Sequence, residues 1–545
     1  MLTRNLFFLS LSALLLFACT SKEEQTKIDQ LALDKAQKKN VLKNFLVHSN
    51  SITDTKIKSL IETLHSDSSL IWSDGKTLNN SALRLRNITA NSIKYGLDSS
   101  FYLTQKLRKL YNSSISDTGN IDVLAEGELE FSKAAIQFFT QVKYGFLNHE
   151  EKDSVYFQWK FDSLTTQDIE TIRNGIISNE LDKVIDTLEP QFIGYKTLRK
   201  SWGNFVENKA FGFEKVSVHS MKEDSTKSYK KAKLALLTSN FIDSNELEND
   251  SIFIERLKQF QIHHGLKPDA RVGRASAYAL SRSNADRRLS VMTSLEKLKW
   301  EKFEDDSLLY VNIPSYLLRV IEYNEIKQEY RAVVGKTINR TPTFSADMKY
   351  LILNPFWHIP YSISSKEILP KLKRDSNLVK KKGYTIYDKN RNRIDASKVD
   401  WSKVSSNSFN YKISQTRSGG TALGRVKFIF TNKYSIYFHD TPSKSLFKND
   451  IRAYSHGCVR IKDPLNLATY LMSRVNPAYT QDSVENFVKR GIQKRIDLDY
   501  PLRVSIRYFS CEGTEEGNVI FYRDIYKKET EIKSVIQDLI YSKSE

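Results

Sequence analysis

Cysteine is scarce in this sequence, with only Cys19, Cys458 and Cys511 in a chain of 545 residues. So few thiols exclude a disulfide-stapled scaffold, although they leave room for one bridge between Cys458 and Cys511. Cys511 ends the strand-like segment LRVSIRYFSC and is typical of a small apolar residue on one face of a strand. Cys458 is therefore the candidate working thiol.

Acidic residues are outnumbered by basic ones. The chain has 83 Lys and Arg against 64 Asp and Glu, which gives a formal net charge of +19 and a sequence pI near 9.4. This excess predicts attraction to an anionic partner, such as nucleic acid, a membrane surface or an acidic polymer. Disorder is excluded, because 40% of the residues are apolar and 11% are aromatic, enough for the cores of three or four domains.

Long apolar runs are also missing, apart from residues 6–17 near the start of the chain. This run follows Arg4 and is too short for a comfortable membrane span, so it predicts an export signal. Its end, Leu-Phe-Ala-Cys, resembles a bacterial lipoprotein signal, which implies that residues 1–18 are a signal peptide and that Cys19 is acylated. A plain signal peptide or anchor with an incidental cysteine is the alternative.

Export makes nucleic acid a poor partner and favours an anionic polymer of the envelope. We expect membrane attachment through the lipid anchor. Thr20 stands where an Asp often retains lipoproteins in the inner membrane. It therefore favours the outer membrane of a Gram-negative-type envelope, with the protein facing the periplasm. Residues 19–45 are polar and charged, which suits a tether or a first solvated helix.

Residues 46–205 are predicted to form a helical scaffold domain. In the segment LEFSKAAIQFFTQVKYGFLNH, apolar residues recur every three or four positions, which is the period of an amphipathic helix. Short turns such as KYGLDSSFY join these segments and favour a bundle. We expect this part to be structural, without chemistry of its own.

Residues 228–283 resemble the three-helix peptidoglycan-binding domain. The resemblance rests on four residue pairs, which are Phe-Gln at 260–261, Gly-Leu at 265–266, Pro-Asp at 268–269 and Val-Gly at 272–273. The second half of the unit matches better than the first, so the unit either binds glycan or serves only in packing. His263 and His264 are adjacent and point about a hundred degrees apart on a helix, which argues against a metal site.

From residue 300 onward the apolar period shortens towards two, as in SLLYVNIPSYLLRVIEYNEIKQEYRAVVGK, which predicts strands. Dense strands with few helices indicate a mainly β catalytic sandwich over residues 300–510, or a barrel-like sheet. A basic stretch over 363–410 interrupts them and is either an inserted lid or a solvated surface lobe. Residues 511–545 follow as a C-terminal extension. The predicted fold class is therefore α+β and multidomain.

A nucleophilic cysteine needs a base, donors for an oxyanion and a group that orients the base. His439 ends a predicted strand in YFHDTP and can approach the Cys458 sulfur from a neighbouring strand. His456 lies two residues before Cys458. On an extended segment their Cα atoms are therefore roughly 6.5 to 7 Å apart, and their side chains run nearly parallel. His439 is therefore the predicted base. His456 and Ser455 are predicted to position the loop.

Gly457 is the candidate source of the oxyanion donors. It has no Cβ, so the backbone can turn and direct the amides of residues 457 and 458 at one spot. Two amides aimed at one point form an oxyanion hole for a tetrahedral intermediate.

The string SHGCVR at residues 455–460, preceded by His439, resembles the active-site signature of the L,D-transpeptidases. The segments VVGKTINRTPTF and GTALGRVKFIF are similar to the large branch of that family, which carries a scaffold domain, a peptidoglycan-binding domain and a lid insertion. Arg460 stands where the family motif often has Asn, although Arg is common in this branch.

The resemblance implies a reaction on the acidic stem peptides of peptidoglycan. Cys458 attacks the carbonyl after the third residue of a tetrapeptide stem, and D-Ala leaves as a thioester forms. An amine of a neighbouring stem then resolves the thioester into a 3-3 cross-link, with His439 moving the protons. The resemblance implies no cofactor and no metal. Ser455, Arg460, Trp357 and Tyr437 are the expected substrate contacts. A surface role is the alternative for Arg460, and a core position is the alternative for the two aromatic residues. Acylation by carbapenems is also expected.

Two alternatives use the same residues. If water resolves the thioester, the protein is an L,D-carboxypeptidase or another cell-wall cysteine peptidase. If the site is blocked, it is a catalytically inert peptidoglycan-binding lipoprotein. The intact His439, Gly457 and Cys458 favour an enzyme, and the sequence does not predict an oligomeric state.

Overall fold

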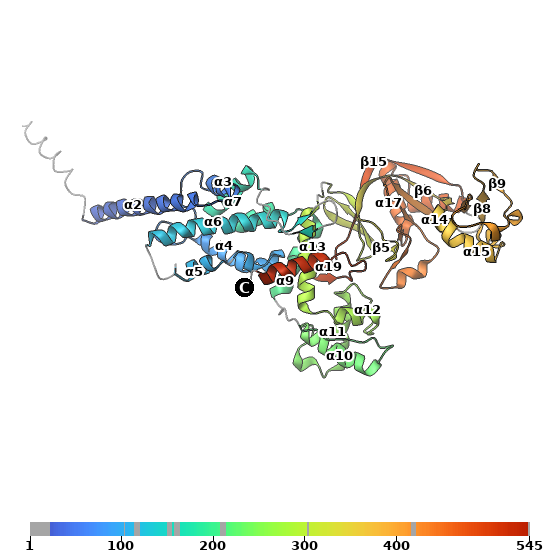
Figure 1. Ribbon diagram of the computed structural model, residues 1–545, viewed down its shortest axis with the longest axis horizontal. Coiled ribbons are helices and arrows are strands. Elements are labelled where there is room, and N and C mark those ends of the chain that lie inside the picture. The colour runs from blue at the N-terminus through green and yellow to red at the C-terminus, as the bar shows by residue number, and fades with distance from the viewer. Residues whose placement is uncertain are drawn as a thin grey trace, which may run out of the picture.

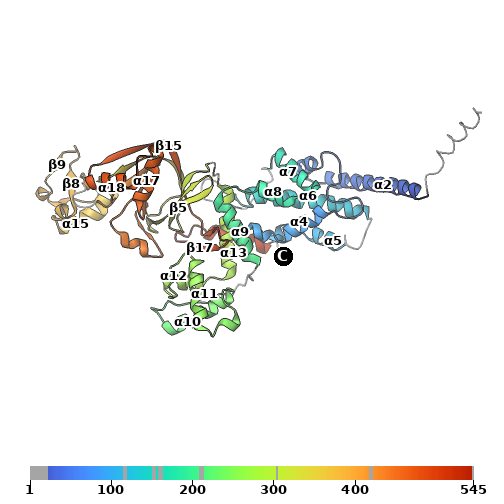
Figure 2. The same ribbon diagram turned by 180° about the vertical axis from the view of Figure 1, so that it is seen from behind.

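A computed structural model describes residues 22–102, 104–113, 120–149, 155–156, 164–207, 214–301, 303, 305–415 and 421–542. The molecule is elongated, with a helical region at one end, a β-rich region at the other and a small helical unit to one side of the centre (Figures 1 and 2). The predicted α+β multidomain class is confirmed. Cys19 and the predicted signal peptide lie outside the described residues.

The helical region is built around one long buried helix, α6 (Ile121–Tyr144). Asn120 caps it by accepting from the amides of Asp122 and Val123, and apolar side chains cover most of its surface. The helices around it are α2 (Lys22–Asn50), α3 (Thr55–Leu64), α4 (Asn80–Ala90), α5 (Gln105–Ser113), α7 (Thr166–Ile177), α8 (Leu181–Leu188) and α9 (Ile193–Glu207). A short antiparallel pair, β1 (Asn148–His149) and β2 (Val155–Tyr156), completes the region.

The described part of the segment predicted as a tether or solvated helix is helical and belongs to α2. Its first turns are exposed, but Val41 and Phe45 are buried in the core of the helical region. These two residues are four positions apart and lie on one face of the helix, which explains why the end of α2 packs against α6.

The small unit at the side consists of α10 (Ser225–Thr238), α11 (Asp250–Ile262) and α12 (Arg274–Leu280) around a core of its own. Gln261 is 1% exposed and bonds inside this unit: its amide nitrogen donates to Ser276 and to the Arg271 carbonyl, and its oxygen accepts from Ala270. In this chain Gln261 of the Phe-Gln pair therefore fixes α11 to α12 and to the loop between them.

Helix α13 (Asn284–Trp300) links the three parts of the molecule and is buried along most of its length. Its Glu296 accepts hydrogen bonds at 2.7 Å from the amides of Phe146 and Leu147 in the helical region. Its Lys297 donates to the Tyr508 carbonyl at the end of the β-rich region. Buried bonds of this kind fix both ends of the molecule to the same helix.

The β-rich region contains one closed sheet in place of the two sheets of a sandwich. The strands pair in the order β13-β5-β14-β12-β11-β6-β15-β3-β4, and a further pairing of β4 with β5 closes the ring. Of the two predicted arrangements, the barrel-like sheet is therefore the observed one. The strands are β3 (Leu308–Asn312), β4 (Leu317–Glu322), β5 (Glu325–Gly335), β6 (Phe344–Leu353), β11 (Val426–Phe430), β12 (Phe438–His439), β13 (Ala453–Ser455), β14 (Val459–Ile461) and β15 (Lys494–Arg507).

Helices α17 (Pro464–Val475) and α18 (Gln481–Arg490) pack against this sheet. One face of β11, β12 and β14 carries Phe428, Phe438 and Val459, which are fully buried in the core that α17 completes. Because side chains alternate along a strand, residues 427, 437, 439, 458 and 460 belong to the opposite face.

The basic insertion between β6 and β11 folds around a small apolar core of its own. It contains β7 (Trp357–His358), α14 (Tyr361–Ile363), a π-helical turn at Ser364–Ile368, α15 (Leu369–Arg374), α16 (Leu378–Lys382), β8 (Tyr384–Tyr387), β9 (Arg393–Ile394) and β10 (Lys412–Gln415). The strands form a four-stranded sheet in the order β7-β10-β8-β9. We call residues 357–415 the lid.

The segment after β15 returns to the middle of the molecule. It forms the hairpin β16 (Cys511–Gly513) and β17 (Val519–Phe521), followed by α19 (Thr530–Ser542). Figure 1 shows α19 beside α13 and α9, and its Ile532 and Ile536 belong to the core of the helical region. Across the described ranges, no helix is both long and apolar enough to cross a membrane.

Candidate active site

The sheet register brings five polar side chains together on one face. β12 and β14 run parallel, with Phe438 opposite Val459 and His439 opposite Arg460. The same register sets Tyr437 beside Cys458, and the Val459 amide donates to the Tyr437 carbonyl. On the other side of β12, the antiparallel strand β11 pairs Lys427 with His439. The face therefore carries Lys427, Tyr437, His439, Cys458 and Arg460.

His439 is buried and held by its own backbone neighbour. Its side chain is 6% exposed, and Nδ1 lies 2.5 Å from the carbonyl oxygen of Asp440. A carbonyl can only accept, so Nδ1 carries the proton and Nε2 keeps a free lone pair. Burial first, and then the charge of Arg460, lower the pKa of His439 to about 3. At neutral pH the imidazole is therefore uncharged and able to accept a proton at Nε2.

The backbone that holds His439 is fixed by the Asp440 carboxylate, which is 2% exposed. One carboxylate oxygen accepts from the Arg425 amide at 2.8 Å, and the other accepts from the Thr441 amide at 2.7 Å. The Arg425 guanidinium and the Lys444 ammonium also contact the carboxylate. Burial acts to raise the pKa of Asp440, but these donors outweigh it, so its pKa is lowered and the group stays ionised.

The Cys458 thiol is partly buried, and its sulfur lies 3.9 Å from the Ser435 carbonyl oxygen. Burial raises the pKa of the thiol, while hydrogen bonds from Tyr437 and the charges of Lys427 and Arg460 act in the opposite direction. A thiol with a raised pKa is protonated at neutral pH, so it needs a base before it can attack. His439, with Nε2 free to accept a proton, lies on the same sheet face as the thiol, on the neighbouring strand.

Gly457 has a backbone conformation that other residues rarely adopt, with φ at +117°. A Cβ at this position would lie 3.1 Å from Cδ1 of Ile436. The Gly457 amide donates to the Ser455 hydroxyl at 3.1 Å, and its carbonyl accepts from the Thr341 hydroxyl at 2.7 Å. The amide predicted as an oxyanion donor is therefore engaged by Ser455 in this conformation.

Ser455 and His456 are neighbours in the chain, but their side chains have different surroundings. Ser455 is 1% exposed and bonds within the loop, which favours a positioning role over the predicted substrate contact. His456 is exposed, and its Nε2 lies 2.5 Å from a carboxylate oxygen of Glu367 in the π-helical turn of the lid. His456 therefore joins the nucleophile loop to the lid and is not directed at the thiol.

The aromatic residues predicted as substrate contacts border the thiol. The Tyr437 hydroxyl interacts with both the Cys458 thiol and Trp357. Trp357 begins the lid at β7 and packs partly against the apolar core of the lid. Together with Arg460 on the next strand, these side chains form one wall beside the nucleophile, where part of the lid meets the sheet.

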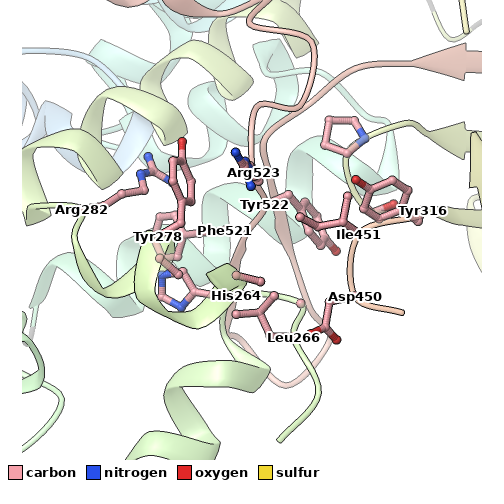
Figure 3. A pocket seen from close by; sticks show the side chains of 15 residues that line it. His264, Leu266, Tyr278, Arg282, Tyr316, Asp450, Ile451, Phe521, Tyr522 and Arg523 are labelled. Carbon is pink, nitrogen blue, oxygen red and sulfur yellow. The ribbon is translucent and has the colours of Figure 1, made fainter. Parts of the chain in front are cut away.

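A narrow pocket lies between the three-helix unit and the closed sheet (Figure 3). Tyr278 and Leu266 line it from the helical side, and Tyr316 and Asp450 from the sheet side, while Arg523 stacks 4.5 Å from the centroid of the Tyr278 ring. Its volume is about 30 Å³, which is room for about one water molecule. It contains none of the predicted site residues and is a seam between two units.

Comparison with known proteins agrees with this geometry. A family profile described as the L,D-transpeptidase catalytic domain matches residues 306–484, and one described as a scaffold domain matches residues 65–201. The chain contains an L,D-transpeptidase catalytic domain preceded by a scaffold domain. A Haemophilus influenzae protein named "Putative L,D-transpeptidase" is 32% identical over 224 residues, which are 41% of this chain and 45% of that protein. The match thus spans less than half the length of that relative.

Three residues of the L,D-transpeptidase site were not predicted from the sequence: Lys427 beside Tyr437, Glu367 on His456 and Thr341 on Gly457. Lys427 alternates with buried Val426 and Phe428 on its strand, so its place on the reactive face could have been inferred from period two. Nothing local marks Glu367 or Thr341, because each meets its partner across a long stretch of chain. Across the described ranges, no cluster of three or more His, Cys, Asp or Glu side chains could hold a metal ion.

Proposed function

We propose that this protein is a peptidoglycan L,D-transpeptidase that forms 3-3 cross-links through a thioester on Cys458. The observation that carries the proposal is the uncharged His439, buried on the same sheet face as the thiol and held with Nε2 free. The +19 net charge suits acidic stem peptides as substrates.

In the first half-reaction the thiol proton moves to Nε2 of His439 as the sulfur attacks the carbonyl carbon of the third stem residue. The Asp440 carbonyl stabilises the imidazolium that forms, because Nδ1 already donates to it. Collapse of the tetrahedral intermediate breaks the C–N bond, and the same proton passes to the departing amine of D-Ala. The product is a thioester and an uncharged His439.

The oxyanion of the intermediate is stabilised by backbone amides of the loop. The Gly457 amide becomes available when the substrate oxygen takes the place of the Ser455 hydroxyl, and the Cys458 amide is the neighbouring donor. The bond from Thr341 to the Gly457 carbonyl keeps the peptide plane oriented during this exchange. Preorganised donors of this kind lower a barrier by about 3 kcal/mol each.

In the second half-reaction a side-chain amine of a neighbouring stem attacks the thioester carbonyl. His439 removes a proton from the amine and returns it to the sulfur, so the thiol is regenerated and an amide links the two stems. Water in place of the amine gives a tripeptide and makes the protein an L,D-carboxypeptidase. The choice between them depends on which nucleophile reaches the thioester beneath the lid.

One incubation separates these outcomes. The chain without residues 1–19 is mixed with purified disaccharide-tetrapeptide, and the products are read by mass spectrometry. We expect dimers that have lost one D-Ala, formed only by the protein with an intact Cys458. Tripeptide monomers alone would establish hydrolysis, and an unchanged substrate, matched by Cys458→Ala, would rule out both activities.

The choice of base is tested by replacing each histidine by glutamine. His439→Gln removes the proton acceptor, so we expect product formation to fall by about a thousandfold. His456→Gln disturbs only the contact with Glu367, and a decrease of less than tenfold is expected. The assignment fails if His456→Gln is the more damaging of the two.

We also propose that the chain is exported and anchored by a lipid on Cys19 in the outer membrane, facing the periplasm, and that residues 228–283 bind glycan. Metabolic labelling with a radioactive fatty acid tests the anchor: wild type is expected to incorporate label and Cys19→Ser is not. Co-sedimentation with insoluble peptidoglycan stripped of stem peptides tests the glycan contact, and failure to sediment would leave the three-helix unit a packing role.

A further inference from the structure

Lys427 lies on the same sheet face as Cys458 and His439, on the strand next to His439. It lies on β11 opposite His439, and its ammonium nitrogen is 3.8 Å from the centroid of the Tyr437 ring. The Tyr437 hydroxyl in turn interacts with the Cys458 thiol. The side chain of Lys427 thus leans across β12 towards the nucleophile, over an aromatic ring that attracts cations.

The charge of Lys427 has no carboxylate to neutralise it. Among the described residues, no Asp or Glu oxygen lies within 4.0 Å of its ammonium nitrogen. Burial accordingly lowers the pKa of Lys427, and the only charge that acts in the opposite direction is that of Cys458. A partly buried cation without an anion is unfavourable unless an anion forms beside it during function.

The site has a place for such an anion. His439 is uncharged in the resting protein, so the Cys458 sulfur has no imidazolium to support a negative charge before proton transfer. Two cations remain on the face, Lys427 and Arg460. Lys427 acts more strongly on the thiol than Arg460 does, whereas Arg460 acts more strongly on His439. The two basic residues therefore have different targets.

We propose that Lys427 is a positioning residue that stabilises the negative charge on the Cys458 sulfur, acting beside and through the Tyr437 ring. The proton leaves the sulfur for Nε2 of His439, and the charge that remains on sulfur is balanced by the Lys427 ammonium. When the thioester forms, the negative charge leaves the sulfur and Lys427 returns to its contact with the ring. The use of Lys427 in catalysis rests on the proposed function. Its effect on the ionisation of the Cys458 thiol does not depend on that function.

The groups that act on the ionisation of the thiol are Lys427 from β11, Tyr437 just before β12 and Arg460 from β14. His439 shares their sheet face, and the Glu367–His456 pair lies between lid and loop. The test must separate Lys427 from the others. Lys427→Met keeps the length and removes the charge, and Lys427→Arg keeps the charge. Lys433→Met is the matched control, because Lys433 likewise lies against a tyrosine ring, 5.3 Å from the Tyr434 centroid in the turn of the same hairpin, whereas the charges that act on the thiol are those of Lys427 and Arg460.

The readout is the pH dependence of Cys458 alkylation by iodoacetamide in the chain without residues 1–19. Cys511 is fully buried, and burial raises the pKa of its thiol to about 12, so it does not compete. Lys427→Met is expected to move the alkylation midpoint up by about one pH unit and to slow the reaction about tenfold at neutral pH. Lys427→Arg is expected to restore most of the rate.

The inference is overturned if Lys427→Met has the same alkylation profile as Lys433→Met, or if Lys427→Arg behaves like Lys427→Met. Circular dichroism checks folding, and Lys427→Gln replaces the Met variant if that one unfolds. Alkylation needs no peptidoglycan. A shifted midpoint in a protein that leaves muropeptides unchanged therefore supports the role of Lys427 while refuting the proposed function. An unshifted midpoint in a protein that cross-links muropeptides refutes the role of Lys427 while supporting the proposed function.

Discussion

The Asp440 carboxylate is the support on which the His439 backbone depends, and Asp440→Asn tests this dependence. The change keeps the shape of the side chain but replaces one oxygen by an NH2 group. In the wild type one oxygen accepts from the Arg425 amide and the other from the Thr441 amide. Whichever way the asparagine turns, one of these buried amides then faces a donor instead of an acceptor.

The expected loss of stability follows from that one contact. A hydrogen bond from a backbone amide to a charged acceptor contributes about 1.5 to 3 kcal/mol, so we expect Asp440→Asn to destabilise this region by about 2 kcal/mol. The Arg425 and Lys444 side chains add little, because they are 46% and 44% exposed and water can solvate them. The pKa of Asp440 is lowered in the folded protein, so its contribution is complete above the unfolded-state pKa near 4 and is lost progressively as the pH falls from there through the lower folded-state pKa.

Hydrogen exchange of the full chain, read by mass spectrometry, measures this loss locally. A decrease of 2 kcal/mol corresponds to about thirtyfold less protection of the amides in β11 and β12 at pH 7. The difference between wild type and variant should shrink as the pH falls below 4. Asp463→Asn is the control, because Asp463 is 61% exposed and pairs only with Lys462. Equal protection at pH 7, or a difference that does not decrease at all between pH 5 and pH 3, would refute the reasoning.

Three further substitutions test the loop and the lid. Gly457→Ala places a Cβ at φ +117° against Ile436, so the oxyanion donors turn away and muropeptide turnover should fall about a hundredfold; unchanged turnover contradicts this. Glu367→Gln weakens the contact with His456, so we expect faster deuterium uptake that is confined to the lid. Uptake equal to that of the wild type would show that this contact does not hold the lid. Thr341→Val removes the hydroxyl bonded to Gly457 and should lower stability by about 1 to 3 kcal/mol in calorimetry, with Thr341→Ser unaffected; equal stability of all three proteins argues against it.

The strand pattern of the sequence was enough to predict the catalytic region as mainly β, but not how its sheet closes. Period two tells which residues share a face of one strand, and it says nothing about which strands are neighbours. The pairing of β4 with β5, which closes the ring, links residues that are also joined by a tight turn, so either a sandwich or a barrel satisfied the pattern. The lid shows a similar limit. Its sequence is dominated by basic residues, so the apolar core formed by nine buried residues was not predicted.

The candidate site divides in the same way. Spacing alone could predict that His439 and Cys458 lie on neighbouring strands, and their parallel pairing places them on one sheet face; the roles of base and nucleophile stay predictions. The role of Ser455 as acceptor for the Gly457 amide could not be predicted, since it depends on the turn of the loop at φ +117°. Glu367 and Thr341 act across long stretches of sequence, and only the folded chain shows which partners they meet.

The C-terminal segment gives the helical region a physical connection to the nucleophile. The Tyr526 hydroxyl donates to the Gly335 carbonyl and accepts from the Thr341 amide, and Thr341 in turn holds Gly457. A few residues beyond Tyr526, α19 begins and buries Ile532 and Ile536 in the core of the helical region.

Three consecutive hydrogen-bonded groups therefore join the loop of Cys458 to a helix whose position is set by the scaffold. Because the neighbouring residues Glu296 and Lys297 bond α13 to the helical region and to the end of the β-rich region, a shift of the scaffold against the sheet would break these polar contacts. The helical region is thus linked through these contacts to the loop that carries Cys458.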